Sequence, residues 1–377
     1  MKYYIIAGEA SGDLYGSNLV RELKVKDSSA VFRAWGGDLM QNQGVELVKH
    51  YQDHNYMGFL EVLKNLGTIL KNIAFCKKDI KKFSPDALIL IDFPGFNMRI
   101  AKYFYQYSFP VLYYIAPQVW AWKENRVQAI KKYVDRLYVI LPFEKEFLKK
   151  RGLVSNYMGH PLLENILNFK NNESVSKSVF IKIHDLVQGR PIISLIPGSR
   201  KQEIEKILPV MLRAVSSYSN EFNIVVAGMK NFKCLYGQIT SNYNAKVIYE
   251  DTYNLLNNSS RALVTSGTAT LETAFFNVPQ VVCYKSSWLS YVIAKSLVKI
   301  KYISLVNLIM EKEVVKELIQ KDLSVFKLTK ELNKLNDSFA LDKMQEDYQV
   351  LIAKSLGENV SKKIATDMFK TIESFQK

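Results

Sequence analysis

The stretch Ala262-Leu263-Val264-Thr265-Ser266-Gly267-Thr268-Ala269-Thr270-Leu271-Glu272 joins the pattern of a buried strand to the pattern of a helix. Its small residues Ser266, Gly267 and Thr268 would let backbone N–H groups approach an anion at the helix N-terminus, which carries partial positive charge. Glu272, one turn into the helix, can accept hydrogen bonds from a pair of sugar hydroxyls. The stretch therefore fits a phosphate site in a nucleotide-sugar pocket, and fits simple helix capping equally well.

Similar strand-like runs recur along the chain, with helical patterns between them. They are continuous apolar runs without alternation, which is typical of parallel strands covered on both faces. Alternation of such strands with helices predicts an α/β fold with a doubly wound sheet in each half. The runs cover residues 3–7, 87–91, 111–115 and 137–141 in the first half, and 192–196, 224–227, 246–248, 262–265 and 280–283 in the second.

The polar segment 168–177 predicts the boundary between the two halves. We expect one domain over residues 1–170 and a second over 171–349, with a cleft between them. From about Glu311 the pattern is helical and carries no strand signal. The C-terminal segment, about 350–377, is expected to return to the first domain, because the apolar face of its last helix must pack on something. That helix covers roughly 359–375, and its face is formed by Val360, Ile364, Met368, Ile372 and Phe375.

Composition narrows the class of protein. The chain has 377 residues, of which 48% are hydrophobic and 23% charged, as in globular proteins. Its three cysteines are far apart, which predicts no disulfide framework, no metal cluster and a reducing cytoplasm. No apolar run approaches the roughly 18 to 20 residues of a membrane span, and Glu9 and Asp13 interrupt the apolar start too early for a signal peptide. We expect a soluble protein or one that lies on a surface.

The charge balance indicates polyanionic partners. There are 51 Lys and Arg against 36 Asp and Glu, a formal net charge of +15. Such an excess attracts nucleic acid, anionic lipid or phosphorylated substrates, although a generally lysine-rich surface explains it equally well. The sequence has no zinc-finger spacing and no RNA-binding signature of aromatic and glycine residues, so no nucleic acid is expected as a partner.

Polar residues follow the predicted strands at the ends where open α/β sheets bind ligands. The turn 8–13, Gly-Glu-Ala-Ser-Gly-Asp, follows the first strand. Either Ser11 caps the next helix, or the backbone at Gly12 approaches a substrate whose hydroxyls Glu9 or Asp13 hold. The glycine spacing fits neither a dinucleotide fingerprint nor a P-loop.

Asp92 ends the next buried strand and is followed by a Pro-Gly bend and Asn97. A carboxylate in this position is a candidate general base, or else a cap of the following helix. Trp120 suits a site wall or a sugar platform as well as a plain core position. His160 is a further candidate near the domain junction, where a structural histidine is the alternative.

The second half offers a second anion site. Pro197-Gly198-Ser199-Arg200 ends a strand and leads into a helix, so helix N–H groups and a guanidinium converge there, as a diphosphate requires. Gly228, at another strand end, is compatible with the same pocket. The chain has no Asp-x-Asp pair and no metal-ligand spacing. We therefore expect neither metal nor cofactor, with Arg200, the helix N-termini and Lys285 neutralising the leaving group.

Eight ordered motifs closely resemble the lipid A disaccharide synthase family nearly end to end. This resemblance implies a GT-B-type fold, with two Rossmann-like domains, a cleft and a C-terminal helix that crosses back. It also implies an inverting hexosyltransferase of lipid A biosynthesis, which transfers 2,3-diacylglucosamine from UDP-2,3-diacylglucosamine to 2,3-diacylglucosamine 1-phosphate. The motifs are residues 8–13, 91–97, 117–122, 141–144, 159–161, 197–200, 266–272 and 302–308.

The resemblance also implies roles for individual residues. Arg200 and Ser199 would meet the UDP diphosphate, Ser266, Gly267 and Thr268 would complete that site, and Glu272 would bind the ribose. Asp92 would deprotonate the acceptor 6-hydroxyl or orient the group that does. The sugar side would be lined by Glu9, Ser11 and Asp13, and Asn307 would lie near the cleft.

Acylated substrates imply contact with a membrane. The segment Met57–Lys82 mixes apolar residues with lysines, which predicts an interfacial helix on an anionic membrane surface. An ordinary helix packed on the sheet is as good an interpretation after Gly67. The family works at the cytoplasmic face of the Gram-negative inner membrane, which implies a peripheral location for this chain. A homodimer is an assembly that the sequence leaves open.

Two other functions remain open at this point. A UDP-N-acetylglucosamine 2-epimerase, or a transferase with a polyprenyl-linked acceptor, would use Arg200 and Glu272 similarly. A basic nucleic-acid-binding protein would instead present a continuous basic stripe.

Overall fold

The computed structural model describes residues 1–54, 66–121, 126–286 and 301–376, which fold as two compact units. Unit 1 runs from Met1 to Pro161 and resumes at Gly357, and unit 2 runs from Leu162 to Leu356. The segment 168–177, where the sequence suggested a boundary, spans the end of α8 (Pro161–Asn172) and the start of α9 (Lys177–Ile183).

Unit 1 is built on a seven-stranded parallel sheet in the order β3-β2-β1-β4-β5-β6-β7. All five residues of the central strand β4 are buried, as expected for a parallel strand covered by helices on both faces. The strands are β1 (Lys2–Ala7), β2 (Val31–Gly36), β3 (Glu46–His50), β4 (Ala87–Ile91), β5 (Val111–Tyr114), β6 (Arg136–Val139) and β7 (Asn156–Tyr157). The helices are α1 (Ala10–Lys26), α2 (Asp38–Asn42), α4 (Leu66–Phe83), α5 (Pro94–Phe104), α6 (Arg126–Tyr133), α7 (Pro142–Lys149) and α18 (Val360–Gln376).

Unit 2 is built on a six-stranded parallel sheet in the order β10-β9-β8-β11-β12-β13. Its strands are β8 (Ile192–Ile196), β9 (Asn223–Gly228), β10 (Lys246–Tyr249), β11 (Arg261–Thr265), β12 (Gln280–Tyr284) and β13 (Lys316–Ile319). Besides α8 and α9, its helices are α10 (Lys201–Val215), α11 (Lys233–Thr240), α12 (Thr252–Asn258), α13 (Thr268–Phe275), α15 (Leu305–Met310), α16 (Val325–Lys334) and α17 (Ser338–Ser355). The prediction of one doubly wound parallel sheet in each half is confirmed.

The strands that the sequence did not predict are mostly sheet edges. The expectation of no strand after about Glu311 was wrong, because β13 pairs with β12 at one edge of unit 2. Edge strands leave one side open to solvent and so carry charged residues that interrupt the apolar run. The edge β3 was missed for the same reason, and the edge β7 because it has only two residues, Asn156 and Tyr157. In β2, Arg33 breaks the pattern, and its Nη2 pairs with Asp79 Oδ1 at 2.8 Å.

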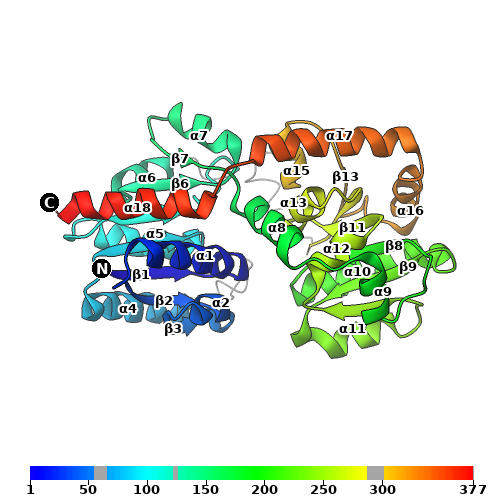
Figure 1. Ribbon diagram of the computed structural model, residues 1–377, viewed down its shortest axis with the longest axis horizontal. Coiled ribbons are helices and arrows are strands. Elements are labelled where there is room, and N and C mark those ends of the chain that lie inside the picture. The colour runs from blue at the N-terminus through cyan, green and yellow to red at the C-terminus, as the bar shows by residue number, and fades with distance from the viewer. Residues whose placement is uncertain (55–65, 122–125, 287–300, 377) are drawn as a thin grey trace. The chain divides into compact units, whose positions relative to one another are not determined.

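The C-terminal helix α18 returns to unit 1, as the sequence predicted, and lies beside α1 (Figure 1). Val360, Ile364, Met368 and Ile372 are buried, whereas Phe375 is 45% exposed and does not belong to the buried face.

A polar contact fixes α18 against β6. Arg136 donates from Nε and Nη2 to the two carboxylate oxygens of Asp367, at 2.9 and 2.8 Å. Tyr138 donates its hydroxyl to Asp367 Oδ2 at 2.7 Å. The last helix is therefore held to unit 1 by an apolar face and by one bidentate ion pair.

Candidate functional site

Each sheet changes its winding direction between two neighbouring strands, β1 and β4 in unit 1 and β8 and β11 in unit 2. In open α/β sheets, ligands bind beyond the carboxyl ends of the strands at such a point. The polar turns that the sequence singled out follow these four strands. The fold thus brings the turn 8–13 to Asp92 in unit 1, and residues 197–200 to residues 266–272 in unit 2.

Asp92 lies in a strained turn directly after β4. The φ angles of Asp92 and Phe93 are 45° and 49°, in the left-handed region that non-glycine residues rarely adopt. The side chain is half-buried, and burial raises the pKa of Asp92 to about 7, with a further contribution from the charge of Glu9. A carboxyl group that titrates near neutral pH is suited to accept a proton from a substrate hydroxyl.

The main chain of this turn is held by buried side chains. The amide of Asn97 donates to the carbonyl oxygens of Asp92 and Ile91, at 2.8 and 3.2 Å. The hydroxyl of Tyr113 donates to the same Asp92 carbonyl at 2.6 Å. Asn97 has no exposed surface, which argues against its predicted contact with substrate. Its position favours a role in shaping the turn.

The turn 8–13 forms the start of α1. Glu9 is the N-cap residue and makes no side-chain capping bond, so the capping role suggested for Ser11 was wrong. Ser11 is instead the second residue of the helix and is half-buried. Gly12 lies close to β1, since a Cβ on it would sit 3.1 Å from the Cβ of Ala7.

The surroundings of Asp13 argue against its predicted contact with substrate hydroxyls. Its side chain is 2% exposed and accepts hydrogen bonds from the backbone N–H groups of Gly37, Leu39 and Met40, at 2.8, 3.0 and 3.1 Å. Both carboxylate oxygens are therefore used to fix the start of α2. This arrangement assigns Asp13 a structural role rather than a catalytic one.

Glu144 is a buried carboxyl group that the sequence analysis did not place among the site residues. Its oxygens accept from the indole N–H of Trp120 at 3.0 Å and from the backbone N–H groups of Ile140 and Leu141, at 3.1 and 2.9 Å. Burial raises the pKa of Glu144 to about 7, and the charge of Asp92 contributes to the shift. Glu144 stands at the third position of α7, where a helix-capping glutamate is common. Capping was thus the signal that could have revealed it.

Trp120 is held by contacts with its neighbours, and His160 by burial. The ring of Trp120 is half-buried and packs edge-on against Phe143, with the ring centroids 5.0 Å apart. Its neighbour Trp122 lies outside the described residues. His160 is 1% exposed, and burial lowers its pKa to about 3, so the imidazole is neutral at physiological pH. This burial argues for a structural histidine rather than for direct contact with substrate.

In unit 2, Arg200 stands at the N-cap of α10 with its side chain 51% exposed. Its guanidinium donates from Nη1 to Glu203 Oε1 at 3.0 Å. Ser199 is exposed, and Gly198 has a φ of 102°, where a Cβ would collide with Glu203. An arginine and a helix N-terminus are thus presented together, as the sequence predicted. Glu203 is an added neighbour that the sequence analysis did not consider.

The turn after β11 leads into α13. Gly267 is the N-cap residue with a φ of 149°, and open space surrounds the place where its Cβ would be. Ser266 donates its hydroxyl to the carbonyl of Ile303 at 3.0 Å, and Thr268 begins the helix. Glu272 is half-buried, makes no side-chain hydrogen bond within the described part of the chain, and burial raises its pKa to about 7. Its carboxyl group is available to a ligand.

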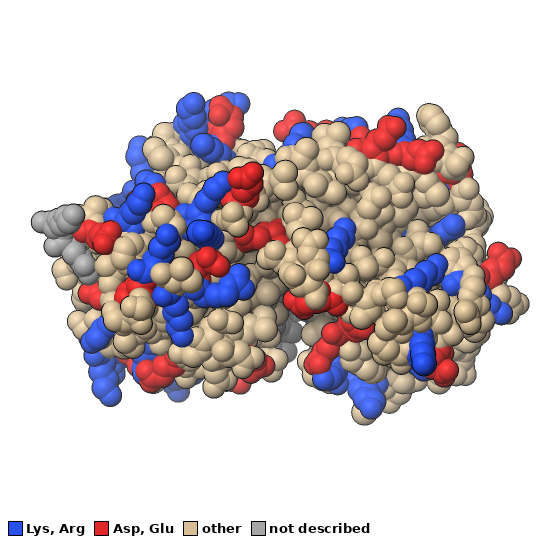
Figure 2. All heavy atoms as spheres, viewed as in Figure 1, with Lys and Arg blue, Asp and Glu red and all other residues tan. Residues whose placement is uncertain are grey.

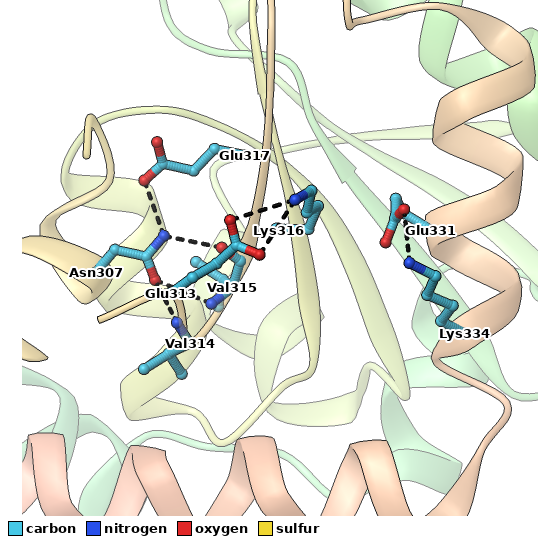
Figure 3. Close-up of polar contacts among 8 residues, drawn as sticks. All are labelled: Asn307, Glu313, Val314, Val315, Lys316, Glu317, Glu331 and Lys334. Atoms are coloured by element: carbon cyan, nitrogen blue, oxygen red, sulfur yellow. Dashed lines mark hydrogen bonds and ion pairs between the residues drawn. The ribbon is translucent and has the colours of Figure 1, made fainter. Parts of the chain in front are cut away.

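Two further residues that the sequence predicted for the site have structural roles, Gly228 in strand packing and Asn307 in hydrogen bonding. Gly228 ends β9, and a Cβ there would lie 2.7 Å from Val247 and 2.8 Å from Tyr249 on the adjacent strand β10. Asn307 is fully buried, and Figure 3 shows its amide between β13 and the loop that precedes it. It donates to Val315 O and Glu317 Oε1, at 2.8 and 2.9 Å, and accepts from the backbone N–H groups of Val314 and Val315. The amide nitrogen of Asn307 thus donates two hydrogen bonds and its oxygen accepts two. This saturation argues against a contact with substrate.

Comparison with known sequences identifies the family. The sequence model described as lipid-A-disaccharide synthetase matches residues 3–369 of this chain. The chain belongs to this family. Among curated relatives, the lipid-A-disaccharide synthase of Geobacter metallireducens is 36% identical over 343 residues, covering 88% of this chain and 87% of the relative. That of Syntrophus aciditrophicus is 36% identical and covers 84% and 83%. Lipid-A-disaccharide synthases are glycosyltransferases, and this member is an enzyme of that class.

Solved structures agree on the fold. A Staphylococcus aureus MnaA–UDP co-structure has a TM-score of 0.69 at 14% identity and covers 99% of this chain and 97% of its own. A Neisseria meningitidis UDP-GlcNAc 2-epimerase bound to UDP-GlcNAc has a TM-score of 0.66 at 12% identity, with coverages of 99% and 100%. At such identities the likeness shows the fold alone, which is GT-B-type with two Rossmann-like units.

Proposed function

We propose that this lipid-A-disaccharide synthase family member transfers 2,3-diacylglucosamine from UDP-2,3-diacylglucosamine to 2,3-diacylglucosamine 1-phosphate. The products are the β-1,6-linked disaccharide 1-phosphate and UDP. The observation that carries the proposal is the pairing of two helix starts on neighbouring strands of unit 2, one with Arg200 and the other with Glu272. A diphosphate beside a ribose is the ligand that such a pair of turns fits best.

The donor would bind unit 2 through its UDP group. Arg200, Ser199 and the N-terminus of α10 would hold one part of the diphosphate, and the N–H groups around Gly267 and Thr268 the other. Glu272 would accept hydrogen bonds from the ribose hydroxyls, because its carboxyl group has no other bonding partner within the described residues. Arg200 carries the charge that would stabilise the departing diphosphate.

Asp92 would act as the general base for the acceptor. The oxygen of the acceptor 6-hydroxyl attacks C1 of the donor sugar while the bond from C1 to the UDP oxygen breaks. The proton of the hydroxyl passes to the Asp92 carboxylate, and UDP leaves with the bonding electron pair. Attack from the face opposite UDP inverts the configuration at C1 and gives the β linkage.

Two variants test these assignments. Asp92→Asn should lower transfer by about 10²- to 10⁴-fold, the usual scale for a general base, while leaving UDP affinity unchanged. Arg200→Ala should weaken UDP binding measured by calorimetry, and Lys201→Ala, which alters an adjacent exposed cation on α10, is its control. Near-normal turnover of Asp92→Asn would remove the base assignment. Unchanged UDP affinity of Arg200→Ala would remove the diphosphate assignment.

The alternative chemistries have less support. A UDP-GlcNAc 2-epimerase shares the fold at 12% identity, whereas the family model and relatives at 33–36% identity are those of the synthase. The rival nucleic-acid function would require a continuous basic stripe. Figure 2 shows Lys and Arg side chains interspersed with Asp and Glu on the face drawn. Measuring UDP release with the acceptor present and absent separates a transferase from an epimerase.

Helix α4 would bring the enzyme to an anionic membrane surface. Part of the predicted segment, residues 55–65, lies outside the described residues. In α4 itself, Ile73, Cys76 and Ile80 are buried, so this side packs on the unit as an ordinary helix. Leu66 and Leu70, in contrast, are 43% and 54% exposed.

Two lysines of the same helix, the half-buried Lys77 and the exposed Lys81, lie over an aromatic ring of α5. The Nζ atoms of Lys77 and Lys81 lie 4.1 and 5.0 Å from the ring centroid of Tyr103, which is itself exposed. Exposed leucine, lysine and tyrosine together favour the interfacial region of an anionic bilayer. No helix in the described ranges is long and apolar enough to cross a membrane. A peripheral location on the inner membrane is therefore our proposal, and a homodimer stays a prediction.

Vesicle binding tests the membrane proposal. Leu70→Glu should weaken sedimentation with vesicles that contain phosphatidylglycerol, because it places a charge among the exposed leucines of α4. Val25→Glu, at a 72% exposed position of α1, is the matched control. Equal loss in both variants, or no binding of the wild type at low salt, would contradict this surface.

A further inference from the structure

The turn at Asp92 and Phe93 has a backbone conformation that its own residues do not favour. Two successive non-glycine residues have φ angles of 45° and 49°, and such residues persist in the left-handed region only where surrounding contacts hold them. On one side, the ring of Phe93 fills the space where a Cβ of Gly8 would lie. The turn is therefore held from outside, and the contacts that hold it decide where the Asp92 carboxylate lies.

The shortest of these contacts is made by Tyr113. This residue lies on β5, the neighbour of β4, and its side chain has no exposed surface. Its hydroxyl donates to the main-chain carbonyl of Asp92 at 2.6 Å, and the amide of Asn97 donates to the same oxygen at 2.8 Å. The backbone N–H of Asp92 donates to the carbonyl of Tyr114 at 3.0 Å.

We infer that Tyr113 is a positioning residue for transfer, which keeps the Asp92 carboxylate in its working place by clamping the carbonyl of the same residue. The inference rests on the proposed function of Asp92 as general base. Without the hydroxyl, Asn97 alone holds the carbonyl, and the turn can relax toward ordinary φ values. Relaxation rotates the carboxylate away from its place and gives it more water.

The substitution Tyr113→Phe removes only this hydroxyl. A displacement of about 1 Å at a reacting group can cost roughly 10²-fold in rate, so we expect kcat to fall about 10- to 100-fold. UDP affinity should stay within about twofold, because the UDP site belongs to unit 2. The low-pH limb of the kcat profile should move to lower pH, because a better hydrated carboxyl group has a lower pKa.

Tyr138→Phe is the matched control. Tyr138 lies on the next strand, β6, is equally buried, and donates its hydroxyl to Asp367 of α18 at 2.7 Å. It thus loses a buried tyrosine hydrogen bond in the same sheet without touching the Asp92 turn. Its kcat and its pH profile should match those of the wild type.

The outcomes distinguish the positioning role of Tyr113 from the general-base role of Asp92. If Tyr113→Phe keeps wild-type kcat and pH limb while Asp92→Asn is inactive, the positioning role is wrong and the base assignment stands. If Asp92→Asn stays active, the proposed function itself fails. If Tyr113→Phe does not fold, Asn97→Ala removes the other donor to the same carbonyl and must lower kcat and shift the pH limb in the same way. An Asn97→Ala enzyme with normal kcat and pH profile would overturn the inference.

Discussion

Replacing Asp92 by Asn should make the folded protein more stable while it lowers transfer by about 10²- to 10⁴-fold. Burial raises the pKa of Asp92 from 3.8 to about 7, so the folded state disfavours the charged carboxylate relative to the unfolded chain. The folded protein therefore binds this proton more tightly, and the contribution of Asp92 to wild-type stability falls as pH rises from about 4 to about 7. Asparagine carries no titrating proton and escapes this loss.

The size of the effect follows from the shift. The pKa of Asp92 rises by about 3 on folding, and each pKa unit corresponds to about 1.4 kcal/mol. Above pH 7 the charged carboxylate therefore lowers the free energy of unfolding by roughly 4 kcal/mol, an upper value since the side chain is half-buried. At pH 5 only the interval from 3.8 to 5 counts, or roughly 1.6 kcal/mol. The stability advantage of Asp92→Asn should therefore grow by about 2 to 3 kcal/mol between pH 5 and pH 8. Glu9 and Glu144 share part of this change, because both carboxyl groups lie in the field of Asp92.

Urea unfolding of wild type and variant at pH 5, 6, 7 and 8 measures this difference, because groups unaffected by the substitution cancel. Asp13→Asn is the control. Its carboxylate accepts three backbone hydrogen bonds, so the amide should destabilise the protein instead. A stability difference between Asp92→Asn and wild type that stays constant from pH 5 to pH 8 would refute the reasoning, since the carboxyl group would then be as well solvated in the folded state as in the unfolded one.

Three further predictions follow from the same contacts. Glu9→Gln should move the low-pH limb of kcat below its expected midpoint of about 7, because the charge of Glu9 raises the pKa of Asp92; an unmoved limb in the pH–rate profile would mean that the two groups do not interact. Arg136→Ala should destabilise unit 1 by about 1 to 2 kcal/mol in urea unfolding, since it removes a partly exposed bidentate pair with Asp367; an unchanged midpoint would show that the pair adds nothing. Gly228→Ala should cost about 1 to 3 kcal/mol, because the added methyl overpacks β9 against β10; thermal unfolding as in wild type would contradict the packing described.

Much of the fold could be predicted from local sequence. Central parallel strands such as β4 and β8 are covered on both faces, so they appear as uninterrupted apolar runs, and their bounds agree with the prediction. Edge strands such as β13 have no such signature, because one side meets solvent and tolerates charge. The order of the strands could not be predicted either, because strand pairing depends on contacts between residues far apart in the chain.

The candidate site divides in a similar way. Arg200 and Glu272 could be named as candidates because a charged residue in or just before the first turns of a helix that follows a buried strand is visible in the local sequence. Asp13 has the same local setting, and only the tertiary structure shows that its oxygens are taken by the backbone of α2. Asn97 and Asn307 likewise look like site residues until their burial and their backbone partners are known.

The sequence by itself thus determined the family, the two parallel sheets and the polar turns proposed as the site, because helix starts, apolar runs and ordered motifs are local properties. The tertiary structure decided which of the polar residues in those turns are free to meet a ligand. It placed Tyr113 and Asn97 on the carbonyl of Asp92 and left Glu272 without a side-chain hydrogen bond among the described residues. The physical reason is that burial and hydrogen bonding set the pKa of a carboxyl group and its freedom to react. Both depend on segments that are distant in the sequence.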